Sequence, residues 1–191
     1  MASRKTAALE AMAYHEAAHA VVAHALGLKL KSATIVPPAV QGGELPHRSP
    51  LRGLKLEIDG TERTRLDAQH AIAVCLAGFI AHRRQRPQTW REFQGRSDVE
   101  EAFDLALRAY GSGELASSMI AAVLHETIGL IQRRWGDIEV VAAALLDRRK
   151  LTGREIDQLL DPAGAPPPAS GAAPSPAGAR KPKKPKRRRR W

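Results

Sequence analysis

The segment "MAYHEAAHAVVAHALG", residues 12–27, places two histidines and a glutamate inside an apolar stretch. On an α-helix, residues four apart lie on one face, so His15 and His19 can offer two imidazole nitrogens to one Zn²⁺ ion. Glu16 lies about 100° around the helix from His15, where its carboxylate can take a proton from an attacking water without binding the metal. This arrangement is the H-E-x-x-H pattern of zinc hydrolytic centres.

The same residues also have a purely structural interpretation. Two histidines on an apolar helix face can be core residues that are hydrogen-bonded to a carbonyl or a carboxylate, and five residues alone leave the two interpretations about evenly balanced. The glutamate favours the metal centre, because a buried carboxylate costs free energy unless it has a partner, and the sequence indicates none.

A catalytic zinc takes three protein ligands and keeps one position open. The third ligand must therefore come from elsewhere in the chain, from an Asp, Glu or His at the end of an element that faces the first helix. Spacing alone does not select among the candidates, which are His47, His70, His82, Asp98, Asp104 and His125.

Hydrophobic periodicity predicts a first helix over about residues 7–26, with Thr6 as its N-cap and Gly27 at its C-terminal end. The stretch "KSATIVPP" is typical of a short strand ended by prolines. The stretch "GLKLEIDG", residues 53–60, alternates apolar and polar residues, which predicts a half-buried strand closed by an Asp-Gly turn.

Most of the remaining body is predicted to be helical. Ser97 and Glu100 form a capping-box pattern that places Asp98 in the first turn of its helix, and Thr152 and Glu155 form a second such pattern. The expected helices cover residues 61–85, 97–111, 114–135, 137–149 and 152–160. The predicted fold class is thus mainly α (α+β), a helical domain with a small sheet.

Composition divides the 191 residues into a body and a tail. Residues 162–191 contain no acid and nine of the 30 Lys and Arg residues, which leaves 21 basic and 20 acidic residues in 1–161. We therefore expect a nearly neutral domain over 1–160, a disordered Pro/Ala-rich linker over 161–179 and a basic tail over 180–191.

The tail "ARKPKKPKRRRRW" can attract nucleic acid or an acidic protein partner through its charge alone, or it can be a solvated end without a partner. Cys75 is the single cysteine, so no internal disulfide can form. The chain has no signal-peptide pattern and no run of 18 apolar residues, so we expect a cytoplasmic protein without a transmembrane segment.

Several segments resemble the peptidase domain of FtsH-type ATP-dependent zinc metalloproteases. The stretch "AYHEAAHAVVAHALGLKLKSATIVP" is similar to that family's A-x-H-E-A-G-H-A helix and following strand, and "VCLAGFIAHRR" is similar to its next helix with a Leu-x-Gly core. The segments "SDVEEAFDLALRAYG" and "GDIEVVAAALLDRRKLTGREIDQLL" resemble the part that supplies the third zinc ligand and the C-terminal helices. The resemblance covers residues 8–160, in order.

The resemblance implies a zincin-like helical peptidase domain in which His15, His19 and Asp98 bind zinc and Glu16 is the general base. Asp104 is then a solvated residue of the same helix as Asp98. Ala18 stands where the family has glycine. The chain contains no G-x-x-x-x-G-K-[ST] motif, and we expect a stand-alone form without the ATPase and membrane anchor.

The sequence therefore favours a zinc-dependent endopeptidase that cleaves flexible or unfolded polypeptides without its own ATPase. An extended substrate would add to a sheet edge near residues 32–36 or 53–58. The alternative is a catalytically weak or inactive peptidase-derived module that acts through its basic tail, and a third hypothesis is a nucleic-acid-binding protein with an incidental histidine pair. The oligomeric state stays open.

Overall fold

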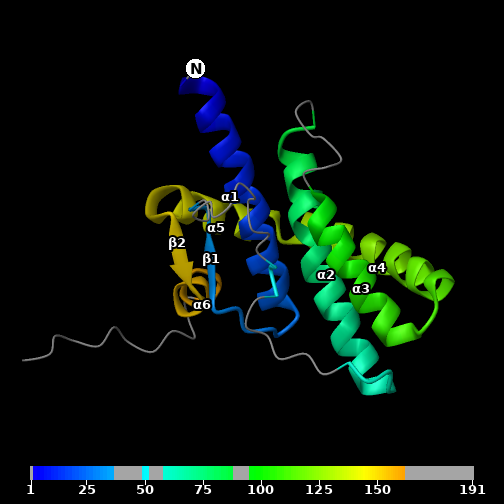
Figure 1. Ribbon diagram of the computed structural model, residues 1–191. Helices are drawn as coiled ribbons and strands as arrows, with labels where there is room; N and C mark the ends of the chain where they lie inside the picture. Colours follow the sequence, from blue (N-terminus) through cyan, green and yellow to red (C-terminus); the bar gives the residue numbers. More distant parts are fainter. Residues whose placement is uncertain (1, 37–48, 52–57, 88–94, 162–191) are drawn as a thin grey trace, which may run out of the picture.

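A computed structural model describes residues 2–36, 49–51, 58–87 and 95–161 (Figure 1). Within them the chain forms six helices and one two-stranded sheet, which confirms the mainly helical class with a small sheet. In chain order the elements are α1 (Ala2–Ala25), β1 (Ser32–Thr34), α2 (Glu62–Gln85), α3 (Arg96–Tyr110), α4 (Gly113–Arg133), α5 (Trp135–Arg148), β2 (Lys150–Thr152) and α6 (Gly153–Leu160).

The core is built on the close packing of α1 against α2 (Figure 1). Small side chains dominate both contact faces, which suits a chain whose aromatic content is only 4%. Both helices carry many buried alanines, and the larger buried side chains of Val21, Ile72 and Leu76 belong to the same core cluster. The buried alanines of the two helices include Ala13, Ala17, Ala18, Ala20, Ala71, Ala77 and Ala81.

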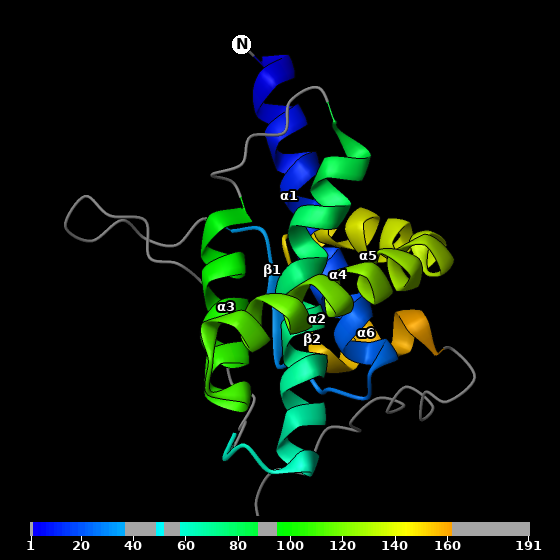
Figure 2. The ribbon, with the colours of Figure 1, turned by 90° about the vertical axis from the view of Figure 1, so that its right-hand side faces the viewer.

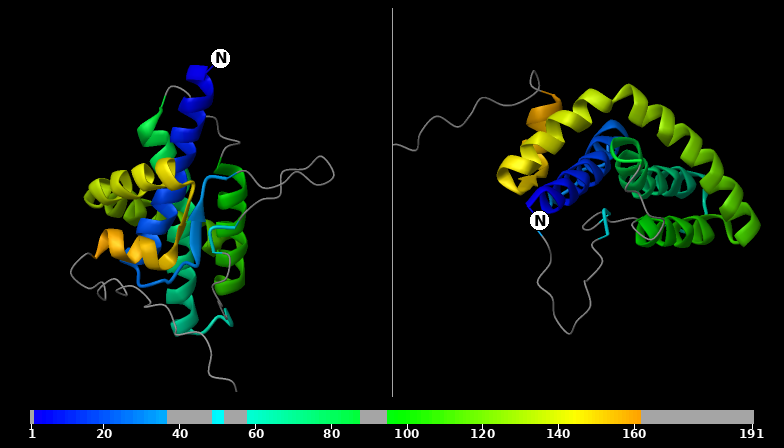
Figure 3. Two further views of the ribbon diagram at one scale, coloured as in Figure 1. Left: turned by 90° about the vertical axis from the view of Figure 1, so that its left-hand side faces the viewer. Right: turned by 90° about the horizontal axis from the view of Figure 1, so that it is seen from above.

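The other helices enclose this pair from two sides. Helices α3 and α4 pack on α2, and α3 runs beside it (Figure 2). Helix α5 packs on α1 and crosses it, and from above α4 and α5 follow one another along an arc outside the central pair (Figure 3). The start of α3 is thereby brought to the α1–α2 contact.

The sheet lies at the open side of α1, where β1 pairs antiparallel with β2. Ala33 is opposite Leu151, and both are buried, whereas Thr34 is opposite Lys150 on the other face. The strand predicted at "KSATIVPP" is confirmed. Strand β2 was not predicted from the sequence, because its three residues form no alternating pattern between two helices.

The predicted strand over residues 53–60 falls largely on 52–57, outside the described residues, and residues 58–60 are not in a strand. Gly60 has φ of +80°, a conformation that suits the glycine of the predicted Asp-Gly turn. In the described chain β1 pairs with β2.

Two predicted helix starts are wrong. Helix α1 already runs from Ala2, so Thr6 lies inside it and is not its N-cap. Helix α3 begins at Arg96 after Gly95, without a side-chain cap, so Ser97 is a helical residue and its capping box does not form. Asp98 nevertheless lies in the first turn, as predicted.

Two other predicted boundaries are confirmed. Gly27 follows α1 with φ of +74°, the left-handed conformation that glycine adopts at helix C-termini. At α6 the Oγ1 of Thr152 accepts the Glu155 backbone N–H, and the Glu155 carboxylate accepts the Thr152 backbone N–H at 2.8 Å. Because α6 has only eight residues, this capping box fixes a large part of its first turn.

Helix α4 is, among the described residues, the one helix that is long and apolar enough to cross a membrane, with 22% of its most apolar stretch buried. One such helix is weak support for a membrane span, since helices of soluble proteins can meet the same criterion. The expectation of no transmembrane segment stays a prediction. The predicted linker and basic tail lie outside the described residues, except for Asp161.

We predict that Thr152→Ala lowers the free energy of unfolding by about 1 kcal/mol, because the cap of α6 is lost. Thr152→Ser, which keeps the hydroxyl, should restore most of this free energy of unfolding in urea denaturation.

Hydrogen bonds from the Thr152 backbone and side chain lower the pKa of Glu155. The stabilisation by Glu155 should therefore be present above its unfolded pKa and be lost as the pH falls through its folded pKa. Equal free energies of unfolding for the parent, Thr152→Ala and Thr152→Ser proteins would contradict the capping role of Thr152.

Candidate metal centre

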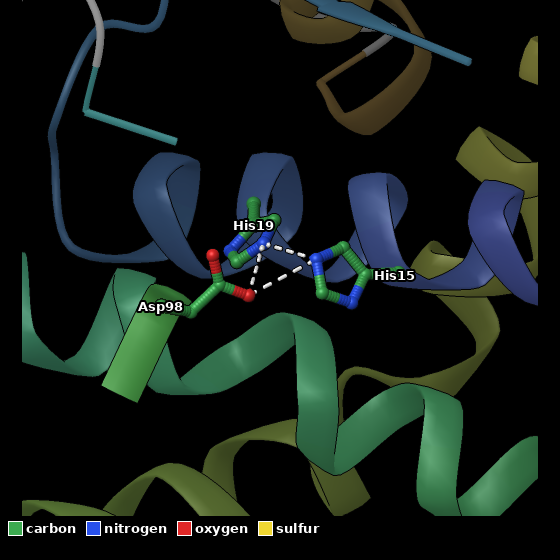
Figure 4. Close-up of side chains that lie close together, drawn as sticks. All are labelled: His15, His19 and Asp98. Atoms are coloured by element: carbon green, nitrogen blue, oxygen red, sulfur yellow. Dashed lines mark hydrogen bonds and ion pairs between the residues drawn. The ribbon is translucent and has the colours of Figure 1, made fainter. Parts of the chain in front are cut away.

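Three side chains that were singled out in the sequence meet between α1, α2 and α3 (Figure 4). His15 and His19 project from successive turns of α1, and Asp98 reaches them from the first turn of α3 (Figure 4). The site is secluded, since His19 is 3% exposed and Asp98 is 4% exposed, while His15 is half-buried. Two elements about eighty residues apart in the chain thus supply one cluster.

The spacing of the three donor atoms fits one tetrahedral ion. The Nε2 atoms of His15 and His19 are 3.0 Å apart, and Asp98 Oδ2 is 3.1 Å from the first and 3.7 Å from the second. Ligand atoms about 2.0–2.1 Å from a tetrahedral zinc ion lie about 3.3–3.4 Å from one another. The three distances scatter around that value, so a small cation fits with little adjustment of the side chains.

The tautomer of His19 is set by the backbone of α2. Its Nδ1–H donates to the carbonyl of Val74 at 2.7 Å, which leaves the Nε2 lone pair directed at His15 and Asp98. Histidines that bind a metal commonly donate their second ring N–H to a carbonyl in this way, because it fixes the ring and raises its basicity. The Val74 carbonyl is thus the outer support that a metal ligand needs.

The pKa of His15 indicates that the cluster favours a positive charge. Burial alone lowers the pKa of His15, but the hydrogen bond to Asp98 and the charges of Asp98 and Glu16 outweigh it, so the pKa is raised. A positive charge is therefore favoured between His15 and Asp98. Either a proton on His15 or a metal ion can supply that charge. The Nε2 lone pair of His19 also faces this space, and a metal ion can accept the lone pairs of both histidines, whereas a single proton cannot.

Gly78 is a site residue to which sequence reasoning gave no role. A Cβ atom at this position would lie 2.4 Å from His19 Nε2 and 2.6 Å from His15 Nε2, closer than real side chains come. The backbone of α2 therefore passes directly against the two imidazoles, and glycine is required there. The signal was present in the Leu-x-Gly core of "VCLAGFIAHRR".

The other described candidates for the third ligand do not join the cluster. Within the described chain, only His15, His19 and Asp98 form a group of three metal-binding side chains. His82 is buried on α2, and its pKa is lowered by burial and then by the charges of His15 and Arg86. The other described candidates, His70, Asp104 and His125, lie outside the group, and His47 is outside the described residues.

A cleft of about 600 Å³ opens beside the cluster. Glu16 and His19 line it together with the residues of strand β1. Glu16 is half-buried, so its carboxylate can meet both the cluster and a molecule in the cleft. Glu16, for which the sequence predicts the role of general base, thus lines the cleft together with His19 of the cluster.

Ser49 and Pro50 also line the cleft. The hydroxyl of Ser49 donates to Glu101 Oε1 at 2.5 Å and accepts the backbone N–H of Leu51 at 3.1 Å. Glu101 lies three residues after Asp98 on α3, so one turn of this helix supplies the cluster aspartate and the carboxylate that holds Ser49 of the cleft lining.

Comparison with models of known protein families and with curated proteins finds no match for this chain. The description of the site therefore depends on its geometry and on the motifs of the sequence.

We predict that Gly78→Ala destabilises the fold by about 1–3 kcal/mol through overpacking and weakens metal binding, because the added methyl displaces the imidazoles. Gly136→Ala is a matched control in α5, since a Cβ there meets nothing within 4 Å. The control should be neutral or slightly stabilising. Thermal unfolding with and without zinc measures both effects, and a Gly78→Ala protein with unchanged stability and zinc affinity would contradict the geometry.

We also predict that the full chain binds one zinc ion and that zinc raises its melting temperature. His15→Ala, His19→Ala and Asp98→Ala should each lower zinc affinity by at least tenfold, because each removes one of three ligands. Asp104→Ala, six residues further along α3, should bind zinc like the parent. Titration calorimetry with metal analysis of the dialysed proteins measures this, and full-affinity binding by the Asp98 variant would refute the assignment.

Proposed function

We propose that this protein is a zinc-dependent endopeptidase that hydrolyses flexible or unfolded polypeptides. We further propose that its fold is zincin-like and related to the peptidase domain of FtsH-type proteases. The observation that carries the proposal is the convergence of His15, His19 and Asp98 beside a cleft that is lined by His19 and Glu16. An incidental histidine pair does not require an aspartate from another helix at such a spacing.

The donor set suits zinc, which accepts two imidazole nitrogens and one carboxylate oxygen and leaves a position for water. His15, His19 and Asp98 would hold the ion. When bound, it would lower the pKa of a water molecule toward neutrality and polarise a peptide carbonyl as a Lewis acid.

The proton transfers are assigned to Glu16. Its carboxylate accepts a proton as the water attacks the peptide carbon and then delivers that proton to the nitrogen of the leaving amine. The charge of Glu16 is among the influences that raise the pKa of His15, which places this carboxylate in the electrostatic neighbourhood of the cluster.

Strand β1 supports a polypeptide as the substrate. In the described chain β1 pairs on one side only, with β2, and it borders the cleft. An extended peptide can bind such an edge through main-chain hydrogen bonds that make little demand on its sequence. Folded segments cannot present their backbone in this way. The substrates are therefore segments that are already extended.

We predict that the zinc-loaded protein cleaves unfolded casein and that Glu16→Gln lowers the rate by about 10²–10⁴-fold, the usual contribution of a general acid–base group. The variant should keep its zinc, since Glu16 is not a ligand. Glu114→Gln, in the first turn of α4, is the matched control and should retain full activity. Cleavage is followed by the release of labelled fragments.

If the parent and Glu16→Gln are equally inert while both hold zinc, the peptidase proposal fails. A binding module that acts through its basic segment would then be the better description.

A further inference from the structure

The cleft beside the metal centre is positively charged along its sheet wall. Lys31 and Lys150 both line it, and Glu16 is the only acidic residue among the described residues that do so. Glu16 lies next to the metal cluster. The other charged side chains of the described lining, Lys31 and Lys150, are both positive. Clefts lined by one sign of charge concentrate ligands of the opposite sign.

The sheet register places the two lysines at different points along β1. Lys31 immediately precedes the strand, and Lys150 of β2 is opposite Thr34 near its end. Three residues of strand correspond to about 10 Å, so the two positions span roughly three residues of an extended peptide lying along β1.

Neither lysine has a partner of opposite charge among the described residues. Both are exposed, and within the described chain neither belongs to an ion pair. By contrast, Arg148 of the neighbouring helix is paired with Glu155. An ammonium group without a carboxylate partner is available to a carboxylate of a bound molecule.

We propose that the cleft selects acidic polypeptide segments, with Asp or Glu side chains meeting Lys31 and Lys150 while the backbone lies along β1. This inference rests on the proposed function for the position of the peptide, and it adds the chemical class of the substrate. The same charge disfavours the chain's own basic segment 180–191 as an occupant of the cleft, because like charges repel.

The test uses full-length Glu16→Gln protein loaded with zinc, which binds peptides without consuming them. Three labelled twelve-residue peptides share a Gly/Ala/Ser background and differ only in three central residues, which are Glu, Gln or Lys. Fluorescence anisotropy should show the Glu peptide binding about three- to tenfold more tightly than the Gln peptide at low salt, the range expected for two partly exposed ion pairs. The Lys peptide should bind most weakly, and 0.5 M salt should reduce the differences, since salt screens such pairs over distances of several ångströms.

The double variant Lys31→Gln/Lys150→Gln should lose the preference for Glu over Gln, and Lys31→Glu/Lys150→Glu should reverse it toward the Lys peptide. Lys29→Gln is the matched control, because Lys29 is an exposed lysine on the same connection that does not line the cleft. All of these variants keep the basic segment 180–191, so a preference that survives in the double variant belongs to that segment and overturns the proposal. Equal affinity for the Glu and Gln peptides, or no binding of either, also overturns it.

These outcomes are separate from the failure of the peptidase proposal. Selective binding that depends on the two lysines, together with a parent protein that never cleaves, would sustain the acidic cleft ligand and refute the activity. Cleavage of all three peptides at equal rates would support the peptidase activity and refute the selection of acidic segments.

Discussion

The structure depends on the approach of one carboxylate to two imidazoles across a helix contact. Asp98 comes from the start of α3, the imidazoles come from α1, and α2 lies between these elements with its backbone pressed against the rings. Such an approach requires a small residue where α2 meets the imidazoles, which Gly78 provides. A larger side chain at this contact would push the donor atoms apart. The spacing of these atoms therefore depends on the packing of the core.

The cleft follows from the same arrangement. Strand β1 leaves α1 after Gly27 and returns along the side of the helix that carries Glu16, where β2 holds it by pairing on one edge. The sheet is small. Because β2 immediately precedes α6, the pairing of β1 with β2 connects α6 to α1. His19 of the cluster, Glu16 and strand β1 therefore border one space, which is the combination that the proposed hydrolysis of an extended chain needs.

Much of this site could be predicted from the sequence. The spacing of His15 and His19, the position of Asp98 in a first helical turn and the capping box at Thr152 are local patterns whose geometry is nearly fixed by helix dimensions. The choice of Asp98 among six candidate ligands did not come from periodicity. It came from the resemblance to a peptidase family, and the structure brings this aspartate to the histidines.

Other features could not be predicted, for physical reasons. The role of Gly78 depends on the distance between two helices, which no local pattern encodes. Strand β2 is three residues long and forms only because β1 is there to pair with it. The start of α1 at Ala2 reflects the strong helix propensity of an alanine-rich segment, which continues the helix past Thr6. The charge of the cleft wall arises from Lys31 and Lys150, which are far apart in the chain and meet only through the sheet.

The central claim is that one zinc ion is held by two imidazoles of α1 and the carboxylate of Asp98. X-ray absorption spectroscopy of the zinc-loaded full chain tests it most directly, because it reports the atoms around the ion. The account predicts a four-coordinate shell of nitrogen and oxygen at about 2.0–2.1 Å with the multiple scattering of two imidazoles. A shell without imidazole scattering, or undiminished zinc affinity of the Asp98→Ala protein, would contradict it.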